Sequence, residues 1–376
     1  MTVTANNMRL LDTTTPSPQD GPVARPGELG PLVEEIAEAG LRGRGGGWFP
    51  TARKLAAVAG ASSRSRPPVV VVNAMEGEPL SAKDARLLAH APRLVVEGAL
   101  AAARTIGAHR VILAVPEGTP VPPGLDVEVR EGPRRFLSGQ ETALVNWLNG
   151  GSAVPTSTVP YRKGVGGRAT LVSNAETFAH LALIARYGAR WFRSEGTAEA
   201  PGTTLISLSV GDGPPMVLEV PVGTPVSEIL HAGGVSFPPD AVLFGGFGGA
   251  WLNGAHAWSL PLSPGPLAAA GAAMGAGIVA VPPPGRRGLD QTASIVEWMA
   301  AQGAHQCGPC TFGLPAVAAD LRELADRPGT ADARAALVRL RRRLGLLPGR
   351  GGCAHPDGVA RLVGSALEVF GRELTR

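Results

Sequence analysis

The chain has 376 residues, enough for two or three domains, and 44% of them are hydrophobic, enough for packed cores. Its net charge of +4 is modest and its arginines are scattered, so nucleic-acid binding is not expected. The 51 Gly and 35 Pro indicate many tight turns, although the base composition of the gene explains them equally well. Three cysteines do not make a disulfide framework and suit a reducing cytoplasm.

The polar N-terminus and the short apolar runs predict neither secretion nor a membrane-spanning helix. Residues 1–26 are polar and rich in Thr and Pro, which predicts a disordered N-terminus without a signal peptide. The longest apolar run, residues 267–281, consists mostly of Ala and Gly and is too short to cross a bilayer. We therefore expect no direct insertion into a membrane.

Residues 27–200 predict an α/β domain. A β-branched run at 69–74 and an apolar run at 109–116 are typical of buried strands, with helical sequence at 86–107 between them. Strand, helix and strand at this spacing form a βαβ unit and predict a largely parallel sheet. A long helix is expected at 177–196.

Two further domains are predicted downstream. In residues 201–284, two alternating strands, a helix beginning after Pro225 and another strand predict a small β-grasp module of α+β class. Residues 285–376 follow a Pro-rich linker and contain four amphipathic segments, which predict a four-helix bundle. The cysteines fall in the loops at the ends of these helices.

A glycine cluster lies in GLRGRGGGWFPTARK, residues 40–54. Glycines let backbone N–H groups approach a ligand closely, and a helix N-terminus behind them favours an anion. Arg44 and Lys54 would complete a phosphate cradle. A plain flexible loop explains the same glycines, and no strand precedes them as in the Rossmann fingerprint.

Polar residues follow the first predicted strand in VVVVNAMEGEPLSAKD, residues 69–84. Asn73, Glu76 and Glu78 come just past the end of this strand, where open parallel sheets bind their ligands. A solvated acidic turn is the alternative. The neighbouring glycine cluster favours a ligand site.

Together these stretches resemble a known family, the flavin-carrying, NADH-oxidising subunit of respiratory complex I and its relatives in soluble hydrogenases and formate dehydrogenases. They are similar to the family's GLRGRGGAGFPTGLKW and NADEGEPGTFKD. Residues 136–150 resemble YICGEETALLNSLEG, and residues 171–197 resemble VNNVETLANVPAIIRRGADWF. The strands after residue 201 resemble the family's β-grasp (SLBB-like) module, and CGPC with a distant Cys353 resembles its iron–sulfur helical domain.

The resemblance implies a Rossmann-like FMN-binding domain with the FMN phosphate on the glycine loop and a nicotinamide dinucleotide, NAD(H), as substrate. It names no certain catalytic residue. The matching FMN positions are Gly43, Arg44, Gly45, Lys54, Asn73, Glu76, Ser173, Asn174 and Thr177. The matching dinucleotide positions are Phe49, a stacking aromatic, with Glu78 and Glu141.

Several positions depart from the family pattern. Met75 stands where the family has Asp, and Gln140 replaces the first Glu of its GEE pair. Ser173 takes the place of the first Asn of VNN, Phe136 replaces Tyr, and Leu80 replaces Gly. Losing two carboxylates near the flavin removes negative charge and should raise its reduction potential.

Two of the three cysteines, Cys307 and Cys310, lie in AHQCGPC, and Cys353 lies far downstream. A CxxC pair also suits a thioredoxin-like site, but no thioredoxin βαβ pattern surrounds it and Cys353 would be unexplained. Aligned with the family's CGQCTPC, the first cysteine falls on Ala304, so a 4Fe-4S cluster lacks one of its four thiolates. Four outcomes stay open: His305 as substitute ligand, a three-iron cluster, a water-capped fourth iron and an empty site.

Three functions are compatible with these motifs. The first is an enzyme in which NADH or NADPH reduces FMN and electrons leave singly through an iron–sulfur centre to a ferredoxin-like or other electron-transfer protein. The second is a flavin relay that uses no nicotinamide. The third is a non-redox scaffold whose cysteines hold zinc or nothing. The expected location is the cytoplasm, including the periphery of a membrane complex.

Overall fold

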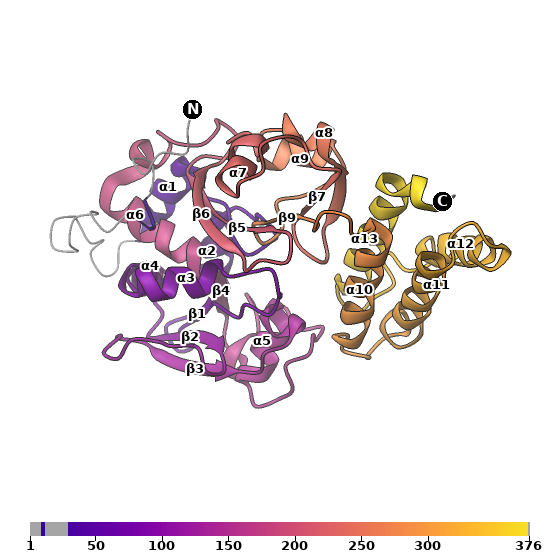
Figure 1. The fold of residues 1–376 in the computed structure, drawn as a ribbon. Helices are drawn as coiled ribbons and strands as arrows, with labels where there is room; N and C mark the ends of the chain where they lie inside the picture. The colour runs from indigo at the N-terminus through magenta and orange to yellow at the C-terminus, as the bar shows by residue number, and fades with distance from the viewer. Residues whose placement is uncertain (1–8, 12–28, 375–376) are drawn as a thin grey trace. The chain divides into compact units, whose positions relative to one another are not determined.

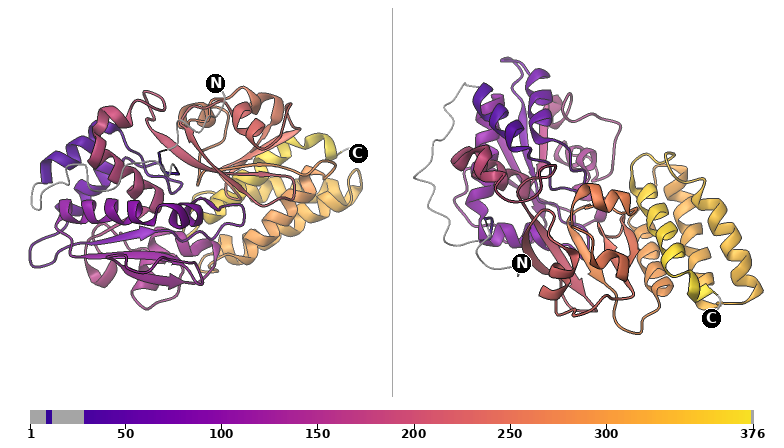
Figure 2. Two further views of the ribbon diagram at one scale, coloured as in Figure 1. Left: turned by 60° about the vertical axis from the view of Figure 1, so that its left-hand side comes forward. Right: turned by 90° about the horizontal axis from the view of Figure 1, so that it is seen from above.

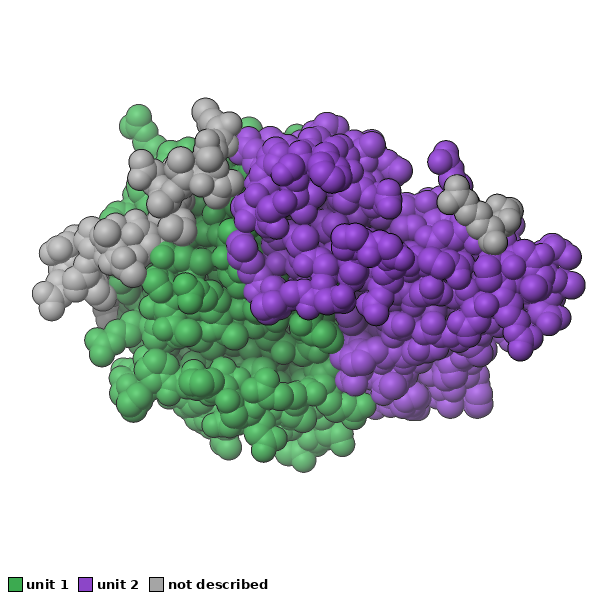
Figure 3. Space-filling view, in the orientation of Figure 1, with its two compact units in different colours: residues 1–207, 217–224 green, residues 208–216, 225–376 purple. Residues whose placement is uncertain are grey.

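The computed structural model describes residues 9–11 and 29–374 of the protein. The chain divides into two compact units, residues 1–207 with 217–224 and residues 208–216 with 225–376, which Figure 3 colours separately. Within the described ranges, no helix is long and apolar enough to cross a membrane.

A four-stranded sheet of order β3-β2-β1-β4 lies at the centre of the first unit (Figure 1). All its pairings are parallel, and the register places Asn73 opposite Asn174 on one side and Ala114 on the other. The predicted βαβ unit and parallel sheet are confirmed. The strands are β1 (Val69–Asn73), β2 (Arg110–Pro116), β3 (Glu128–Gly132) and β4 (Thr170–Asn174).

Helices cover both faces of this sheet (Figures 1 and 2). Alternate strand residues such as Val70 and Val72 face the larger apolar core, whereas Val69 and Val71 face a smaller one. On the smaller core lies α5 (Glu141–Leu148). On the larger core lie α1 (Leu29–Ala39), α2 (Thr51–Gly60), α3 (Lys83–His90), α4 (Pro92–Ile106) and α6 (Ala175–Phe192).

The helical sequence predicted at 86–107 forms two helices. The break falls at Ala91, because a residue before proline is pushed out of the helical conformation, and its φ is −132°. Helix α4 approaches α6 closely at Gly98, where a Cβ would lie 1.8 Å from the carbonyl oxygen of Phe178. This close crossing brings the start of α6 next to the sheet.

Three residues of the predicted disordered N-terminus are fixed by contacts within the first unit. The backbone amides of Arg9, Leu10 and Leu11 all donate to Oε2 of Glu219, at 2.9, 2.8 and 3.0 Å. The guanidinium of Arg9 lies 3.9 Å from the ring centroid of Trp191, a cation–π contact. The rest of that predicted segment lies outside the described residues.

A second, five-stranded sheet has the order β6-β5-β9-β7-β8. The predicted pair of strands, the helix after Pro225 and the following strand are all present. Four elements arise in Ala- and Gly-rich sequence without a clear period, and the sequence did not predict them: α8 (Gly254–Trp258), α9 (Pro264–Ala269), β8 (Ala250–Asn253) and β9 (Ile278–Val281). The others are β5 (Thr203–Val210), β6 (Met216–Pro221), α7 (Val226–Ala232) and β7 (Ala241–Phe244).

Four helices complete the second unit, as the sequence predicted. They are α10 (Gly288–Ala301), α11 (Leu314–Asp326), α12 (Ala331–Leu344) and α13 (His355–Val369). Asp320 of α11 pairs with Arg339 and Arg343 of α12, so these two helices run antiparallel across a short connection. The end of α12 therefore returns to the start of α11. We call residues 303–313 and 345–354, which lie there, the cysteine end.

Candidate functional site

The first sheet has a point at which its strand order reverses. From β1 the chain continues to β2 on one side and later returns to β4 on the other. Open α/β sheets bind ligands beside the carboxyl ends of the strands at such a point. Asn73 ends β1 and Asn174 ends β4, so both expected FMN residues lie at this edge.

The glycine loop reaches the same edge. A Cβ on Gly45 would lie 3.1 Å from Cβ of Asn174, whereas one on Gly47 would meet nothing within 4 Å. The loop is closed by a hydrogen bond from the amide of Gly43 to the carbonyl of Phe49, at 2.9 Å. Helix α2 begins directly behind it at Thr51. The predicted loop-and-helix arrangement thus stands next to the strand end.

The two asparagine side chains are held in place by the protein. Asn73 donates to the carbonyl of Gly139 at 2.8 Å and accepts from the amide of Met75. Asn174 caps α6 by accepting from the amide of Glu176, and it also donates to Asp84 at 2.6 Å. Their orientation is therefore fixed by neighbours in the fold.

A buried ion network lies behind this edge, and sequence reasoning missed it. The ammonium of Lys83, 2% exposed, lies 2.8 Å from Asp84, 2.9 Å from Asn174 and 3.0 Å from Glu176. Glu176 also accepts from the amide of Leu205 at 2.8 Å. The adjacent Lys and Asp in the start of α3 were a visible signal, but their distant partner on α6 was not.

The network keeps its charges at neutral pH. Burial disfavours the ammonium of Lys83, but Asp84 and then Glu176 outweigh it and raise its pKa. Burial would raise the pKa of Glu176, yet Lys83, His180 and Arg44 lower it to about 2. Burial raises the pKa of Asp84 to about 6, although Lys83 acts in the opposite direction. Two cations, Lys83 and Arg44, thus balance two carboxylates.

Arg44 belongs to this network rather than to the loop surface. Its guanidinium donates to the carbonyls of Pro201 and Thr203, at 3.3 and 3.1 Å, and lies 3.7 Å from Glu176. Burial lowers its pKa to about 10, so it stays protonated. Its backbone amide donates to Oγ1 of Thr177 at 2.9 Å. Arg44, which was expected to bind the phosphate, is therefore bonded to interior groups and ties the loop to α6.

The remaining predicted residues of this site have distinct surroundings. Glu76 accepts from the amides of Asp84 and Ala85, at 3.1 and 3.0 Å, and so caps α3. Lys54 lies 3.0 Å from Glu141, which brings an expected FMN residue to an expected dinucleotide residue. Phe49 is 50% exposed beside the loop. Ser173 is the next-to-last residue of β4, and Glu78 lies five residues after the end of β1.

The residues at this edge fit an FMN. Two buried hydroxyls border it without a hydrogen-bond partner among the described residues, Oγ1 of Thr51 at the start of α2 and Oγ of Ser138 beside Gly139. Helices α2 and α6 begin here, and Lys54 adds a cation, as a phosphate requires. Met75 is buried beneath the edge in the smaller core, so the lost family carboxylate is replaced by packing.

The three cysteines gather at the cysteine end of the second unit. Cys310 is buried, and Cys307 and Cys353 are half-buried. Burial, then Cys307, and more weakly Cys353, raise the pKa of the Cys310 thiol to about 11. A Cβ on Gly352 would lie 4.0 Å from Cβ of Cys307, so the segment that carries Cys353 passes beside Cys307. The backbone amides of His305 and Ala304 donate to the Cys310 sulfur.

Three thiols at the cysteine end are the type of ligand that an iron–sulfur cluster takes. Throughout the described part of the chain, no three His, Cys, Asp or Glu side chains are placed to hold one ion. A cluster of several ions holds its thiolates farther apart. The amide of His355 donates to Cys353, and α13 begins there, so N–H groups surround sulfurs that would be negative when ligating.

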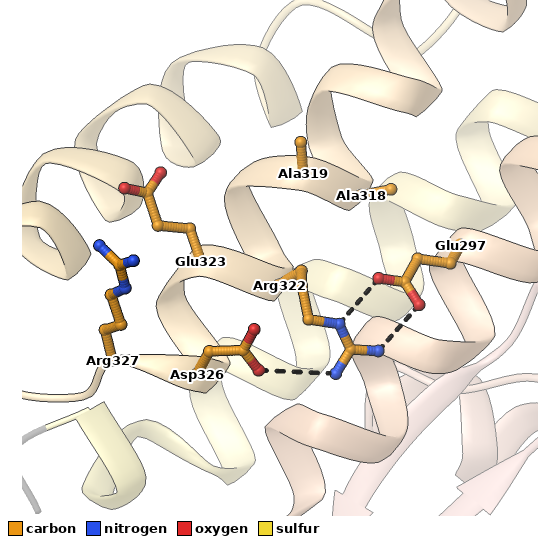
Figure 4. A pocket seen from close by; sticks show the side chains of 7 residues that line it. All are labelled: Glu297, Ala318, Ala319, Arg322, Glu323, Asp326 and Arg327. Carbon is orange, nitrogen blue, oxygen red and sulfur yellow. Dashed lines mark hydrogen bonds and ion pairs between the residues drawn. The ribbon is translucent and has the colours of Figure 1, made fainter.

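A hollow on the second unit contains none of the predicted site residues (Figure 4). Arg322 donates to both carboxylate oxygens of Glu297, at 2.7 and 2.8 Å, and lies 3.9 Å from Asp326. Arg322 thus joins α11 to α10, while Glu323 pairs with Arg339 and Arg327 with Asp332 of α12, which indicates a structural role. The hollow is lined by Glu297, Ala318, Ala319, Arg322, Glu323, Asp326 and Arg327.

The buried network predicts unequal effects for two lysine substitutions. Lys83→Met leaves buried Asp84 without its cation and Glu176 with Arg44 alone, and it should lower the free energy of unfolding by about 3–5 kcal/mol. Lys54→Met removes a partly exposed pair and should cost about 0–1 kcal/mol. Urea unfolding of FMN-free protein, followed by circular dichroism, measures both. Equal losses in the two variants would contradict the network.

Two protein-family models match the chain. Residues 36–183 match the Nuo51 FMN-binding domain, and residues 290–376 match the NADH-ubiquinone oxidoreductase-F iron-sulfur binding region. The first range contains the glycine loop and both strand ends, and the second contains all three cysteines.

Known proteins resemble the chain over most of its length. The F subunits of NADH-quinone oxidoreductase from Salmonella typhimurium and from Escherichia coli are each 31% identical over 376 residues, covering 91% of this chain and 83% of theirs. Crystal structures of NAD+-reducing [NiFe]-hydrogenase match with TM-scores of 0.79 and 0.82 at 26% and 28% identity, in the H2-reduced and air-oxidized states. These matches cover 93% and 94% of this chain but only 62% and 63% of the hydrogenase chains. The chain therefore belongs to the family of the NADH-quinone oxidoreductase F subunit, as its motifs predicted.

Proposed function

We propose that the protein oxidises NAD(P)H with an FMN held at the carboxyl edge of the first sheet and passes electrons through an iron–sulfur centre to a partner protein. The single observation that supports this most is the meeting of the glycine loop, Asn73 and Asn174 where the strand order reverses. When bound, FMN accepts a hydride and releases electrons one at a time.

The protein's part in FMN binding is to supply donors at fixed positions. The glycine loop and the start of α2 offer backbone amides to a phosphate, and Lys54 offers a cation. Asn73, Asn174 and Ser173 lie at the strand ends under the flavin, and Thr177 fixes the loop through the amide of Arg44. The residues proposed to contact or position FMN are Gly43, Arg44, Gly45, Lys54, Asn73, Glu76, Ser173, Asn174 and Thr177.

The nicotinamide dinucleotide is proposed to lie over the exposed face of Phe49. An exposed aromatic ring beside a flavin site offers stacking area at little ordering cost. Glu78 and Glu141 are the acidic residues proposed beside the dinucleotide. Because Lys54 pairs with Glu141, a dinucleotide that displaced Glu141 would free the lysine for phosphate.

Three domains are proposed for these tasks. Residues 27–200 form the Rossmann-like FMN-binding domain, residues 201–284 an SLBB-like β-grasp domain, and residues 285–376 a helical iron–sulfur bundle. The second sheet supports the β-grasp assignment, and the four helices α10 to α13 support the bundle.

An acidic, ferredoxin-like electron carrier is the proposed partner, and the cysteine end is its docking surface. Phe312 is 76% exposed two residues after Cys310, and Leu346 is 46% exposed. Arg350 of the cysteine end, and Arg341 and Arg342 in the last turn of α12 next to it, make no ion pair with any described residue. Arg339 and Arg343, by contrast, pair with acidic groups of α11. A surface with an apolar centre and unpaired cations suits a negatively charged partner. The cytoplasm is the proposed location, because free thiols suit its reducing conditions.

The visible spectrum tests the function directly. Anaerobically purified protein should show a flavin absorption band with a cluster shoulder. NADH should bleach both, because it reduces the flavin and the flavin passes electrons on to the cluster. A coloured protein that dithionite bleaches but NADH does not is a flavin relay. A colourless protein that binds no added FMN would contradict both redox functions, NAD(P)H oxidation and the flavin relay.

Charge reversal in the last turn of α12, next to the cysteine end, tests the partner. Arg341→Glu should slow NADH-driven reduction of an acidic [2Fe–2S] ferredoxin roughly three- to tenfold at low salt, because it removes attraction during encounter. Arg334→Glu, near the opposite end of the same helix, is the matched control with the same change in net charge. Equal rates for the two variants, or no dependence on ionic strength in the unaltered protein, would place docking elsewhere.

A further inference from the structure

The iron–sulfur cluster of the proposed function needs one ligand that the cysteines do not supply. The inference about this ligand rests on the proposed function. The chain has three cysteines, all of them at the cysteine end. A 4Fe-4S cluster takes four ligands. One iron must therefore bind an atom that is not a cysteine sulfur of this chain.

Most polar side chains near the cysteines are engaged in folding. Nε2 of His355 lies 2.9 Å from the carbonyl of Met299, which holds the ring against α10. Asp357 accepts from the amide of Gly349 at 3.1 Å and so fixes the loop before Cys353. Binding iron would cost each of them a contact that shapes the cysteine end.

His305 differs from these residues. Its side chain is exposed, and its ring makes no hydrogen bond to any residue that the structure describes. A Cβ built on Gly303 would lie 3.4 Å from Sγ of Cys310 and 3.7 Å from Cε1 of His305. Cε1 stands between the two ring nitrogens, so the nitrogen-bearing edge of the imidazole and the Cys310 sulfur both border Gly303.

The backbone at His305 is held in an unfavourable conformation. Its φ of 52° lies in the left-handed region, and Trp48 is the only other non-glycine residue with positive φ in the described part of the chain. This conformation is unfavourable for a residue with a Cβ. The same turn directs the amides of Ala304 and His305 at the Cys310 sulfur, so these hydrogen bonds to a cluster ligand offset the strain.

We propose that His305 binds the iron that Ala304 leaves without a thiolate, so that the cluster has three cysteine ligands and one histidine ligand. Imidazole is known to replace thiolate in iron–sulfur centres and raises their potential. A neutral imidazole in place of an anionic thiolate makes the cluster one charge less negative. The cluster should therefore be easier to reduce than a four-thiolate cluster in the same fold.

The test compares four full-length proteins reconstituted anaerobically with iron and sulfide. They are the unaltered chain, His305→Gly, Ala304→Cys combined with His305→Gly, and His256→Ala as a control for removing an exposed histidine. Glycine adopts the positive φ freely, so His305→Gly removes the imidazole without straining the loop. Iron and sulfide are counted, and pulsed electron paramagnetic resonance detects nitrogen bound to the reduced cluster.

The unaltered chain and the His256→Ala variant should hold four irons with strong nitrogen coupling. His305→Gly should lose that coupling and yield the three-iron signal on oxidation. The cysteine-bearing double variant should regain four irons without coupled nitrogen and show a lower reduction potential. A four-iron cluster without nitrogen coupling in the unaltered chain, or coupling that survives in His305→Gly, overturns the histidine ligand alone. No iron or sulfide in any protein, including the double variant, overturns the cluster of the proposed function as well.

Discussion

The buried ammonium of Lys83 is the constraint on which the candidate flavin site depends. A cation taken out of water must be matched by carboxylates and hydrogen-bond acceptors in fixed positions. Asp84, Asn174 and Glu176 provide them, and Glu176 in turn holds the amide of Leu205. One ammonium thus fixes the start of α3 relative to the end of β4, the start of α6 and, through Glu176, the strand β5.

The residues that shape the site are different from the residues that can meet a ligand. Arg44 and Glu76 match family positions around FMN, yet their side chains bond to interior carbonyls and to the start of α3. The groups that face a ligand are then mostly backbone amides, two asparagines held by their neighbours, and one lysine. A site built this way is rigid before its cofactor arrives, which lowers the ordering cost of binding.

Local sequence predicted the elements whose pattern is strong and missed those that depend on distant partners. The β-branched run that forms β1 and the periodic segments that form α10 to α13 were predictable from spacing alone. The strand β9 was not, because its Ala- and Gly-rich neighbourhood shows no period. The bonds between Lys83 and Glu176, and between Glu219 and the amides near Leu10, join residues far apart in the chain. Pairings of that kind follow from the fold and not from any local signal.

Protection of backbone amides from hydrogen exchange tests the central claim, that FMN occupies the edge where β1 and β4 end. Exchange followed by mass spectrometry on the FMN-free and FMN-loaded protein should show new protection in residues 43–51, 74–79 and 173–177. The four C-terminal helices should exchange alike in both forms. Protection confined to other segments, or none at all with FMN bound, would contradict the site.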